Sequence, residues 1–195
     1  MKVLLLGITP SPLRSILKKN SCKVIEQIDP IDLQFFNESK VDFAVSYGFR
    51  HIIRKPIIEH LKGNIINLHI SLLPWNRGAD PNLWSFLENT PKGVTIHYID
   101  DGVDTGDIIA QKELFFNENR ETLASSYEKL NHEIIELFEK TWPLIMQGKS
   151  SRRRQPPGGT FHKTKDKKAF EQLIVDKGWN TAVKNLIGKA LLDKL

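Results

Sequence analysis

Three polar side chains alternate at the end of an apolar run: Asn67, His69 and Ser71. Because alternate residues of a strand point to the same face, a strand ending here would bring an amide, an imidazole and a hydroxyl together. In open α/β sheets, ligands bind beyond the carboxyl ends of the strands. There the amide can donate to an oxygen that gains negative charge, and the imidazole can carry a proton. From the spacing alone, however, an ordinary polar strand edge explains the pattern more simply.

A second polar cluster covers residues 100–107, with four aspartates and two glycines in eight residues. It lacks the twelve-residue frame and terminal glutamate of an EF-hand calcium loop, and no Cys/His cluster has the spacing of a zinc site. We therefore expect no metal. One carboxylate could instead reach the imidazole and raise its pKa, as acid/base catalysis at neutral pH requires. A simple polar turn is the alternative, and the residue types do not single out one carboxylate.

Both clusters belong to a series of sequence blocks that resembles the folate-dependent formyltransferase family. In chain order the blocks are Asn67-Leu68-His69-Ile70-Ser71-Leu72-Leu73-Pro74, Arg77-Gly78, Pro81-x-x-Trp84, Gly93-Val94-Thr95 and Asp104-Thr105-Gly106. The resemblance is strong over residues 47–111 and weaker in the flanks. Several matched blocks in the right order are more specific than any single motif, so they favour the catalytic interpretation. The family includes glycinamide ribonucleotide, methionyl-tRNA and amino-sugar formyltransferases.

The resemblance implies a Rossmann-like catalytic domain that takes its formyl group from 10-formyltetrahydrofolate and uses no metal. By position, Asn67, His69 and Asp104 match the family's catalytic trio. An acceptor amine would attack the formyl carbon, while Asn67 and a protonated His69 stabilise the formyl oxygen. His69 and Asp104 would then move the proton to the departing folate nitrogen. Ser71 would support them by orienting His69 or a water molecule.

The resemblance also places the pterin ring of the folate against residues 46–52 and the turn at residues 100–104. Backbone groups there would hydrogen-bond the ring, and apolar side chains would pack on its faces. Core packing is an equally good interpretation of Phe49. The implied cofactor-binding residues are Tyr47, Gly48, Phe49, Ile52, Asp100 and Gly102.

Departures from the family pattern bear on the acceptor. Members that act on glycinamide ribonucleotide carry a Gly-Ser-Asn run suited to a phosphate, whereas this chain has Gly7-Ile8-Thr9-Pro10-Ser11-Pro12, where two prolines remove amide donors. Neither the early basic insertion nor the β-rich C-terminal domain of the tRNA-acting members is visible. The short amino-sugar branch is therefore favoured, with a dTDP- or UDP-linked aminodideoxyhexose for surface glycans as the acceptor.

Five residues are candidates for binding this acceptor. The two tryptophans would offer a flat face to a sugar or a base, although a buried tryptophan is the commoner outcome. The basic residues would contact a diphosphate. One of them, Lys163, lies in a Gly158–Lys163 run that also resembles the amino-sugar enzymes. The candidates are Trp75, Arg77, Trp84, Arg152 and Lys163.

Two other functions stay open at this point. One is a methionyl-tRNA-type or other aminoacyl formyltransferase with a reduced C-terminus. The other is a non-catalytic folate-binding module, which the intact set of Asn67, His69 and Asp104 disfavours because such a module need not keep all three.

Charge and composition limit the classes of partner. The chain has 195 residues with 28 Lys and Arg against 23 Asp and Glu, a formal net charge of +5. The stretch from Lys149 to Lys168 alone carries +7, which leaves −2 for the other 175 residues. We therefore expect no nucleic-acid partner, and interpret the stretch as a diphosphate-binding segment or a solvated linker. The single cysteine, the absence of an 18-residue apolar run and the absence of a signal-peptide pattern predict a cytoplasmic protein without a membrane span.

The elements that must position these residues alternate between short apolar runs and helical patterns, as in parallel βαβ sheets. The pattern predicts strands at 2–8, 23–28, 41–46 and 63–69, helices at 11–19, 56–61 and from 83, and an antiparallel hairpin of 93–99 with 107–115. A long amphipathic helix follows at 121–147, then a Pro/Gly linker at 155–160 and a helical pair at 166–176 and 180–195.

The predicted fold class is thus α/β, a Rossmann-like formyltransferase domain with a mostly parallel sheet. We expect the catalytic domain over residues 1–150 and a basic linker with a small helical C-terminal extension over residues 151–195. Members of the family often form dimers. The apolar face of the long helix or the terminal helices would supply the contact of a homodimer.

Overall fold

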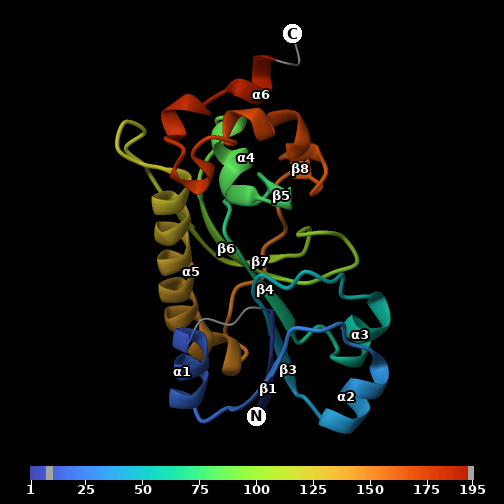
Figure 1. Ribbon diagram of the computed structural model, residues 1–195. Helices are drawn as coiled ribbons and strands as arrows, with labels where there is room; N and C mark the ends of the chain where they lie inside the picture. Colours follow the sequence, from blue (N-terminus) through green and yellow to red (C-terminus); the bar gives the residue numbers. More distant parts are fainter. Residues whose placement is uncertain (8–10, 193–195) are drawn as a thin grey trace. The chain divides into compact units, whose positions relative to one another are not determined.

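The protein is an α/β structure with a central six-stranded sheet (Figure 1). The computed structural model describes residues 1–7 and 11–192. The strand order is β2-β1-β3-β4-β6-β7. β1 pairs in parallel with both β2 and β3, and β3 with β4, which confirms the predicted mostly parallel sheet. The strands are β1 Lys2–Leu6, β2 Lys23–Gln27, β3 Phe43–Ser46, β4 Ile65–His69, β6 Gly93–Tyr98 and β7 Ile108–Glu113.

The last two strands of the sheet form the predicted hairpin. The Tyr98 N–H donates to the Asp107 carbonyl over 2.9 Å, and the Leu114 N–H donates to the Lys92 carbonyl over 2.8 Å. Pairs that converge toward the connecting turn in this way show that β6 and β7 run antiparallel. The hairpin turn is the acidic cluster of residues 100–107, so the fold places that cluster at one end of the sheet.

Helices connect the strands, and their ends follow capping chemistry. At the start of α2, Asp32 accepts a hydrogen bond of 2.8 Å from the Phe35 N–H, and at its end Lys40 adopts a left-handed φ of 50°. The sequence pattern did not predict α2, which has seven residues and only one buried side chain, Phe36. The helices of the first 90 residues are α1 Ser11–Lys19, α2 Leu33–Ser39, α3 Lys55–His60 and α4 Pro81–Leu87.

The long helix α5, Leu123–Met146, confirms the prediction of an amphipathic helix at 121–147. It starts with a reciprocal cap, in which Thr122 Oγ1 accepts from the Ser125 N–H and Ser125 Oγ accepts from the Thr122 N–H. It ends before Gly148, whose φ of 65° is the left-handed conformation that commonly terminates helices. Neither α5 nor any other helix in the described part of the chain has the length and apolar character that crossing a bilayer would need.

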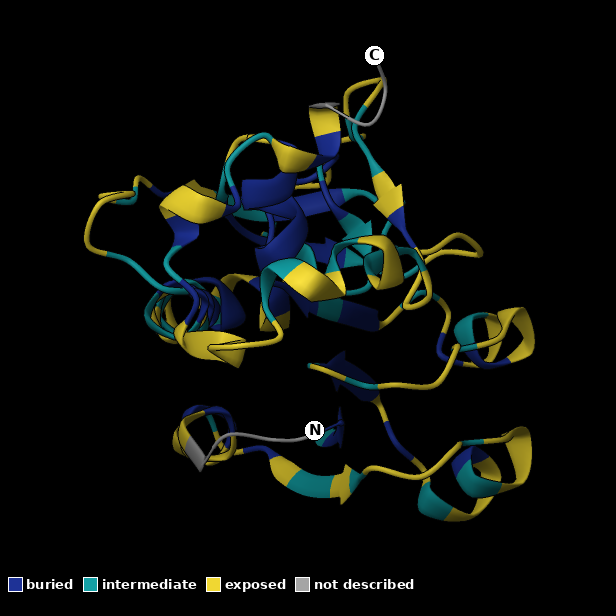
Figure 2. Ribbon diagram, turned by 45° about the horizontal axis from the view of Figure 1, so that its top comes forward, coloured by how far each residue is buried: buried dark blue, intermediate teal, exposed yellow. Residues whose placement is uncertain are grey.

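The residues divide into two compact units whose segments interleave along the chain. The first comprises Met1–His69, Ile96–Ala110 and Ile135–Gln155, and the second comprises Ile70–Thr95, Gln111–Ile134 and Pro156–Leu195. Leu4, Phe36 and Ile65 lie in the core of the first unit. α4 supplies much of the core of the second, and Figure 2 shows it in the colour of buried residues. The expected domains at 1–150 and 151–195 are a different division and stay a prediction.

The C-terminal tail is helical, as expected, but not a pair of α-helices. It consists of the 3₁₀ turns η1 Asp166–Leu173, η2 Gly178–Asn180 and η3 Val183–Asn185, followed by the short α6 Lys189–Leu192. Gly178 and Gly188 have φ values of 53° and 70°, and such residues interrupt a helix. Residues 193–195 of the predicted second helix lie outside the described residues. So do residues 8–10, which include the end of the predicted first strand and most of the run after Gly7.

Candidate functional site

The carboxyl end of β4 carries two of the candidate residues. β3 and β4 are paired so that Ser46 lies opposite Asn67, and both parallel strands end at the same edge of the sheet. Asn67 is half-buried and His69 is 7% exposed. Both side chains therefore lie where open α/β sheets bind ligands, and they are held there by a buried strand rather than by a loop.

Asp104 lies in the turn between β6 and β7, where it adopts a left-handed φ of 53°. Its carbonyl accepts a hydrogen bond of 2.8 Å from Gln155 Nε2, which also donates to the Gly106 carbonyl over 2.9 Å. Within the turn, Thr105 Oγ1 donates to Asp100 Oδ1 over 2.6 Å. These contacts hold the turn in place, and the conformation of Asp104 determines the direction of its carboxylate.

The structure brings Asn67, His69 and Asp104 together within the first unit. Asn67 Nδ2 donates to Asp104 Oδ1 over 3.1 Å, and His69 Nδ1 lies 3.7 Å from Asp104 Oδ2. The side chains of His69 and Asp104 are only 8% and 13% exposed. One carboxylate thus contacts both the amide and the imidazole.

His97 of β6 also joins this cluster, which the sequence did not predict. Its Nε2 lies 3.4 Å from Asp104 Oδ1 and 3.3 Å from Asn67 Nδ2, and the residue is 1% exposed. Its Nδ1 lies 2.8 Å from the Tyr98 carbonyl, which can only accept, so Nδ1 carries a hydrogen. In the neutral ring Nε2 is then an acceptor for the Asn67 amide. In the described residues, no group of three or more His, Cys, Asp or Glu side chains has an arrangement suited to a metal ion.

A cavity of about 460 Å³ lies beside the acidic turn in the first unit. Of the predicted cofactor-binding residues, Asp100 and Gly102 line it, together with the apolar side chains of Ile58 and Ile99. Asp100 Oδ1 also accepts from the Gly102 N–H over 3.1 Å, which fixes the start of the turn. Lys55, Glu59 and Arg152 also line it, so the cavity combines two apolar side chains with charged and polar groups.

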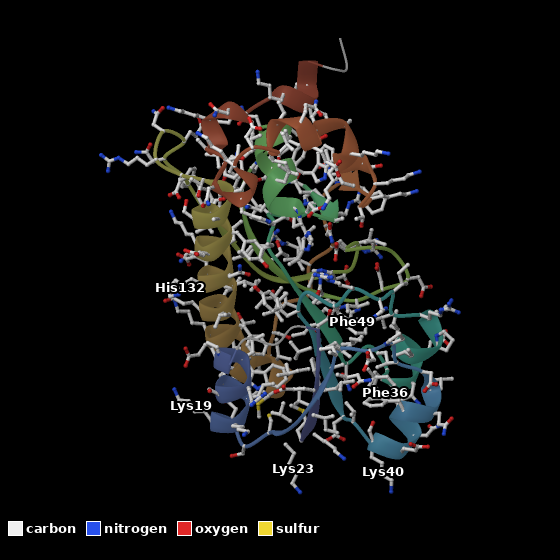
Figure 3. The ribbon with its side chains drawn as sticks, viewed as in Figure 1. Lys19, Lys23, Phe36, Lys40, Phe49 and His132 are labelled. Atoms are coloured by element: carbon white, nitrogen blue, oxygen red, sulfur yellow. The ribbon has the colours of Figure 1, made fainter. Side chains whose placement is uncertain are left out.

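The predicted cofactor residues after β3 lie on the loop that leads into α3. Tyr47 is half-buried and Gly48 is exposed. Phe49 packs against the core of the first unit, the cluster that also contains Phe36, and Figure 3 labels both rings. Ile52 is 81% exposed. None of these four residues lines the cavity beside the acidic turn, so their contact with a pterin stays a prediction.

Ser71 belongs to the second unit, directly beyond β4. Its hydroxyl donates to the Trp75 carbonyl over 2.8 Å, and its own carbonyl accepts from Thr95 Oγ1 over 2.7 Å. These bonds hold the loop after β4, so the structure favours a role for Ser71 in shaping that loop. Trp75 in the same loop is half-buried, and its use as a platform stays a prediction.

The expectation that Trp84 offers a face to the acceptor needs correction. Trp84 is 4% exposed and its ring stacks on His162, with the ring centroids 3.8 Å apart and the planes at 4°. Phe170 contacts the ring edge-on at 5.5 Å. One face of the indole is thus covered by an imidazole inside the core of the second unit, and Trp84 acts there as a packing residue.

The predicted basic substrate-binding residues differ in their surroundings. Arg152 Nε donates to Asp107 Oδ2 over 2.9 Å, and its guanidinium lies 4.4 Å from the centre of the Tyr98 ring. This residue therefore already binds the base of the hairpin. Lys163 is exposed, and Arg77 is half-buried with its Nε donating to the Thr160 carbonyl over 3.4 Å.

Comparison with known proteins shows which molecules this chain is similar to. A family model described as "Formyl transferase" matches residues 8–138. A methionyl-tRNA formyltransferase of Clostridioides difficile is 34% identical over 149 residues, which cover 74% of this chain and 48% of that protein. One of Bacillus cytotoxicus is 36% identical over 148 residues. The chain thus spans about half the length of the curated relatives it matches.

Solved structures add a match over nearly the whole chain. The formyltransferase PseJ of Anoxybacillus kamchatkensis, in complex with UDP-4,6-dideoxy-4-formamido-L-AltNAc and tetrahydrofolate, is 52% identical with a TM-score of 0.92. The match covers 97% of this chain and 100% of that one. A 4-N formyltransferase of Francisella tularensis, 23% identical with a TM-score of 0.78 over 96% of this chain and 87% of that one, shares the fold.

Proposed function

The chain belongs to the formyl transferase family, and we propose that it transfers a formyl group from 10-formyltetrahydrofolate to the amine of a nucleotide-linked amino sugar. The observation that carries this proposal is the 52% identity to PseJ over 97% of the chain, since PseJ was solved with a UDP-linked formamido sugar and tetrahydrofolate. The cluster of Asn67, His69 and Asp104 supplies the groups that such a transfer needs.

The cavity beside the acidic turn fits the folate end of the reaction. Ile58 and Ile99 provide apolar contact, and Asp100 and Gly102 of the acidic turn provide polar groups. We assign the pterin ring to this cavity. When bound, 10-formyltetrahydrofolate supplies the carbon that the acceptor amine attacks and the nitrogen that leaves.

Asn67 has the role of stabilising the charge that develops on the formyl oxygen. Its amide has two hydrogens, and one is directed at Asp104 Oδ1 at 3.1 Å and the other at His97 Nε2 at 3.3 Å. Because the contact with His97 is the longer, we assign the second hydrogen to the formyl oxygen during the reaction. A single donor of this kind contributes about 3 kcal/mol to a transition state.

His69 and Asp104 have the role of moving the proton. As the amine nitrogen bonds to the formyl carbon, His69 takes the amine proton and Asp104 stabilises the imidazolium. His69 then returns the proton to the folate nitrogen as its bond to the formyl carbon breaks. The proton that leaves the amine ends on the folate nitrogen, so the net charge is unchanged, and these steps need no metal.

The proposal includes the expectations about partners, location and division of the chain. We propose a small-molecule acceptor rather than a nucleic acid, action in the cytoplasm, and a homodimer as the working state. We also keep residues 1–150 as the proposed catalytic domain and 151–195 as its extension.

A substrate panel tests the function. The protein is incubated with 10-formyltetrahydrofolate and one of several amines, and release of tetrahydrofolate is followed by absorbance. We expect turnover with a UDP-linked 4-amino-4,6-dideoxy sugar, weaker turnover with its dTDP-linked counterparts, and none with methionyl-tRNA or glycinamide ribonucleotide. Turnover with methionyl-tRNA alone would assign the aminoacyl alternative, and binding of folate without turnover of any amine would assign the binding-module alternative.

A further inference from the structure

A short strand pair in the second unit joins two segments that are far apart in the sequence. β5, Arg77–Gly78, pairs in parallel with β8, Phe161–His162, with Arg77 opposite Phe161 and Gly78 opposite His162. The Arg77 N–H donates to the Thr160 carbonyl over 3.0 Å and the Ala79 N–H to the His162 carbonyl over 2.9 Å. The loop after the catalytic strand β4 is thereby completed by a segment from the C-terminal tail.

Thr160 connects the two segments through a buried polar contact. Its hydroxyl accepts from the Asn76 N–H over 2.9 Å and donates to Asn76 Oδ1 at 3.3 Å. Asn76 is 0% exposed, has a left-handed φ of 56°, and donates from Nδ2 to Thr90 Oγ1 over 2.8 Å. Because buried polar groups are costly to leave unpaired, this contact determines the conformation of the residue that precedes Arg77.

The inner face of the pair is anchored in the core. His162 is buried, stacks on Trp84, and has its Nε2 3.1 Å from Glu88 Oε2. At Gly159 a β-carbon would collide with the Pro74 carbonyl, so the two backbones approach as closely as glycine allows. This tight packing fixes the tail segment against the loop and leaves little freedom for the strand pair to shift.

The outer face presents an aromatic ring beside a cation. Since His162 points into the core, its neighbour Phe161 points the other way, and Phe161 is 43% exposed. Its ring lies over Gly78, where a β-carbon would meet the ring carbon Cε2. Arg77 stands opposite Phe161 in the register, and only its Nε has a side-chain hydrogen bond to the described residues, at 3.4 Å. An arginine has five N–H donors, so the others remain for a ligand.

We propose that the β5–β8 pair is the acceptor-recognition element of this enzyme, with Phe161 stacking on the nucleobase and Arg77 binding the diphosphate. A nucleoside diphosphate combines a flat ring with about two negative charges, and an aromatic face with a guanidinium beside it matches that combination. Thr160 is the positioning residue that holds Arg77 in register. The inference rests on the proposed function and names the residues that would give it acceptor specificity.

Nucleotide binding without turnover tests the recognition contacts. Titration calorimetry with UDP and with dTDP compares the full-length protein with Phe161→Ala and Arg77→Gln, and with Phe115→Ala as the control. Phe115 is 80% exposed in the same unit and lies outside the strand pair.

We expect Phe161→Ala to weaken UDP binding about tenfold, as loss of one base-stacking contact does. Arg77→Gln should weaken it similarly and reduce its dependence on salt. Unchanged affinity in Phe161→Ala would overturn the proposal.

Steady-state kinetics test the positioning role of Thr160. Thr160→Val keeps the shape and removes the hydroxyl, so we expect a KM for the amino-sugar nucleotide raised about tenfold, with the KM for 10-formyltetrahydrofolate unchanged. Thr160→Ser restores the hydroxyl and should recover most of the affinity, which a merely structural role for the methyl group would not produce. Equal rises in both KM values would contradict the positioning role.

The outcomes separate this inference from the proposed function. If the protein turns over an amino sugar and Phe161→Ala binds UDP like the unmodified protein, the function stands and the recognition element is wrong. If no amine is turned over but UDP binding depends on Phe161 and Arg77, the recognition element stands and the reaction is wrong. Phe161→Leu provides a second surface variant, should Phe161→Ala fail to fold.

Discussion

Asn67 Nδ2 donates a hydrogen bond of 3.1 Å to Asp104 Oδ1, which links the end of β4 to the turn between β6 and β7. The same carboxylate lies 3.7 Å from His69 through its other oxygen. Its position thus aligns both the hydrogen-bond donor and the proton carrier. Because the three residues are buried or half-buried, water does not screen these interactions as it would at the surface.

Replacement of Asp104 should therefore affect catalysis more than binding. Asp104→Asn keeps the size of the side chain but removes the charge that stabilises the His69 imidazolium, so we expect kcat to fall at least about a hundredfold. The dissociation constant of tetrahydrofolate, measured by fluorescence titration, should change little. Asp176→Asn is the control for a conservative change at an exposed carboxylate in the tail. A kcat within threefold of the unmodified protein would remove Asp104 from the proton path.

Replacement of Asn67 tests the donor to the formyl oxygen. Asn67→Ala removes the amide and should lower kcat about a hundredfold, since loss of one oxyanion donor typically costs about 3 kcal/mol. Folate binding should be retained, because Asn67 does not line the cavity assigned to the pterin ring. Asn64→Ala is a matched control, for it removes an exposed amide just before β4. Near-normal turnover in Asn67→Ala would show that another group stabilises the oxygen.

His97 should contribute by holding Asn67 and Asp104 in place. His97→Leu fills the space but removes the ring nitrogen that contacts the Asn67 amide and the Asp104 carboxylate, so we expect kcat/KM to fall about tenfold to a hundredfold. His97→Gln can restore a polar contact and should recover part of the loss. The dissociation constant of tetrahydrofolate supplies a second readout and should change little, because His97 does not line the cavity assigned to the pterin ring. A kcat/KM within threefold of the unmodified protein in His97→Leu would contradict the positioning role.

The central sheet and the trio were open to prediction because their signals are local or carried by matched motifs. Short apolar runs predicted β1, β3 and β4, and the acidic turn predicted the hairpin of β6 and β7. The position of Asp104 came from the family resemblance alone, since four aspartates occupy the same turn. That the turn reaches the end of β4 depends on the order of strands in the sheet, which periodicity does not encode.

The residues that the sequence missed or misassigned depend on contacts between distant segments. His97 is a single histidine in an apolar strand, and only its approach to Asp104 distinguishes it from a core residue. The sequence held one signal for His97: it follows Thr95 by two residues, so both polar side chains lie on the same face of the strand. Trp84 is covered by His162, which comes from the tail. Arg152 contacts Asp107, 45 residues earlier in the chain, which its charge did not reveal, and its contact with a phosphate stays a prediction.

Gly106 tests whether the geometry of the acidic turn, rather than its composition, determines activity. A β-carbon at Gly106 would collide with the Tyr98 carbonyl, so in Gly106→Ala the turn must move away from the end of β6. Asp104 lies two residues earlier, and Gln155 binds both the Asp104 and Gly106 carbonyls. We therefore expect a lower melting temperature together with a kcat reduced at least tenfold, measured by calorimetry and by folate release.

Gly148→Ala separates this effect on the site from a general loss of stability. Gly148 has a left-handed φ of 65°, and a β-carbon there would meet no atom within 4 Å. Alanine in that conformation destabilises by about 1 kcal/mol without displacing any neighbour. We expect Gly148→Ala to lower the melting temperature as well but to leave kcat unchanged. If both variants lose activity in proportion to stability, the position of the acidic turn does not limit catalysis. A loss confined to Gly106→Ala would show that the contact between Gly106 and Tyr98 keeps the Asp104 carboxylate within reach of His69.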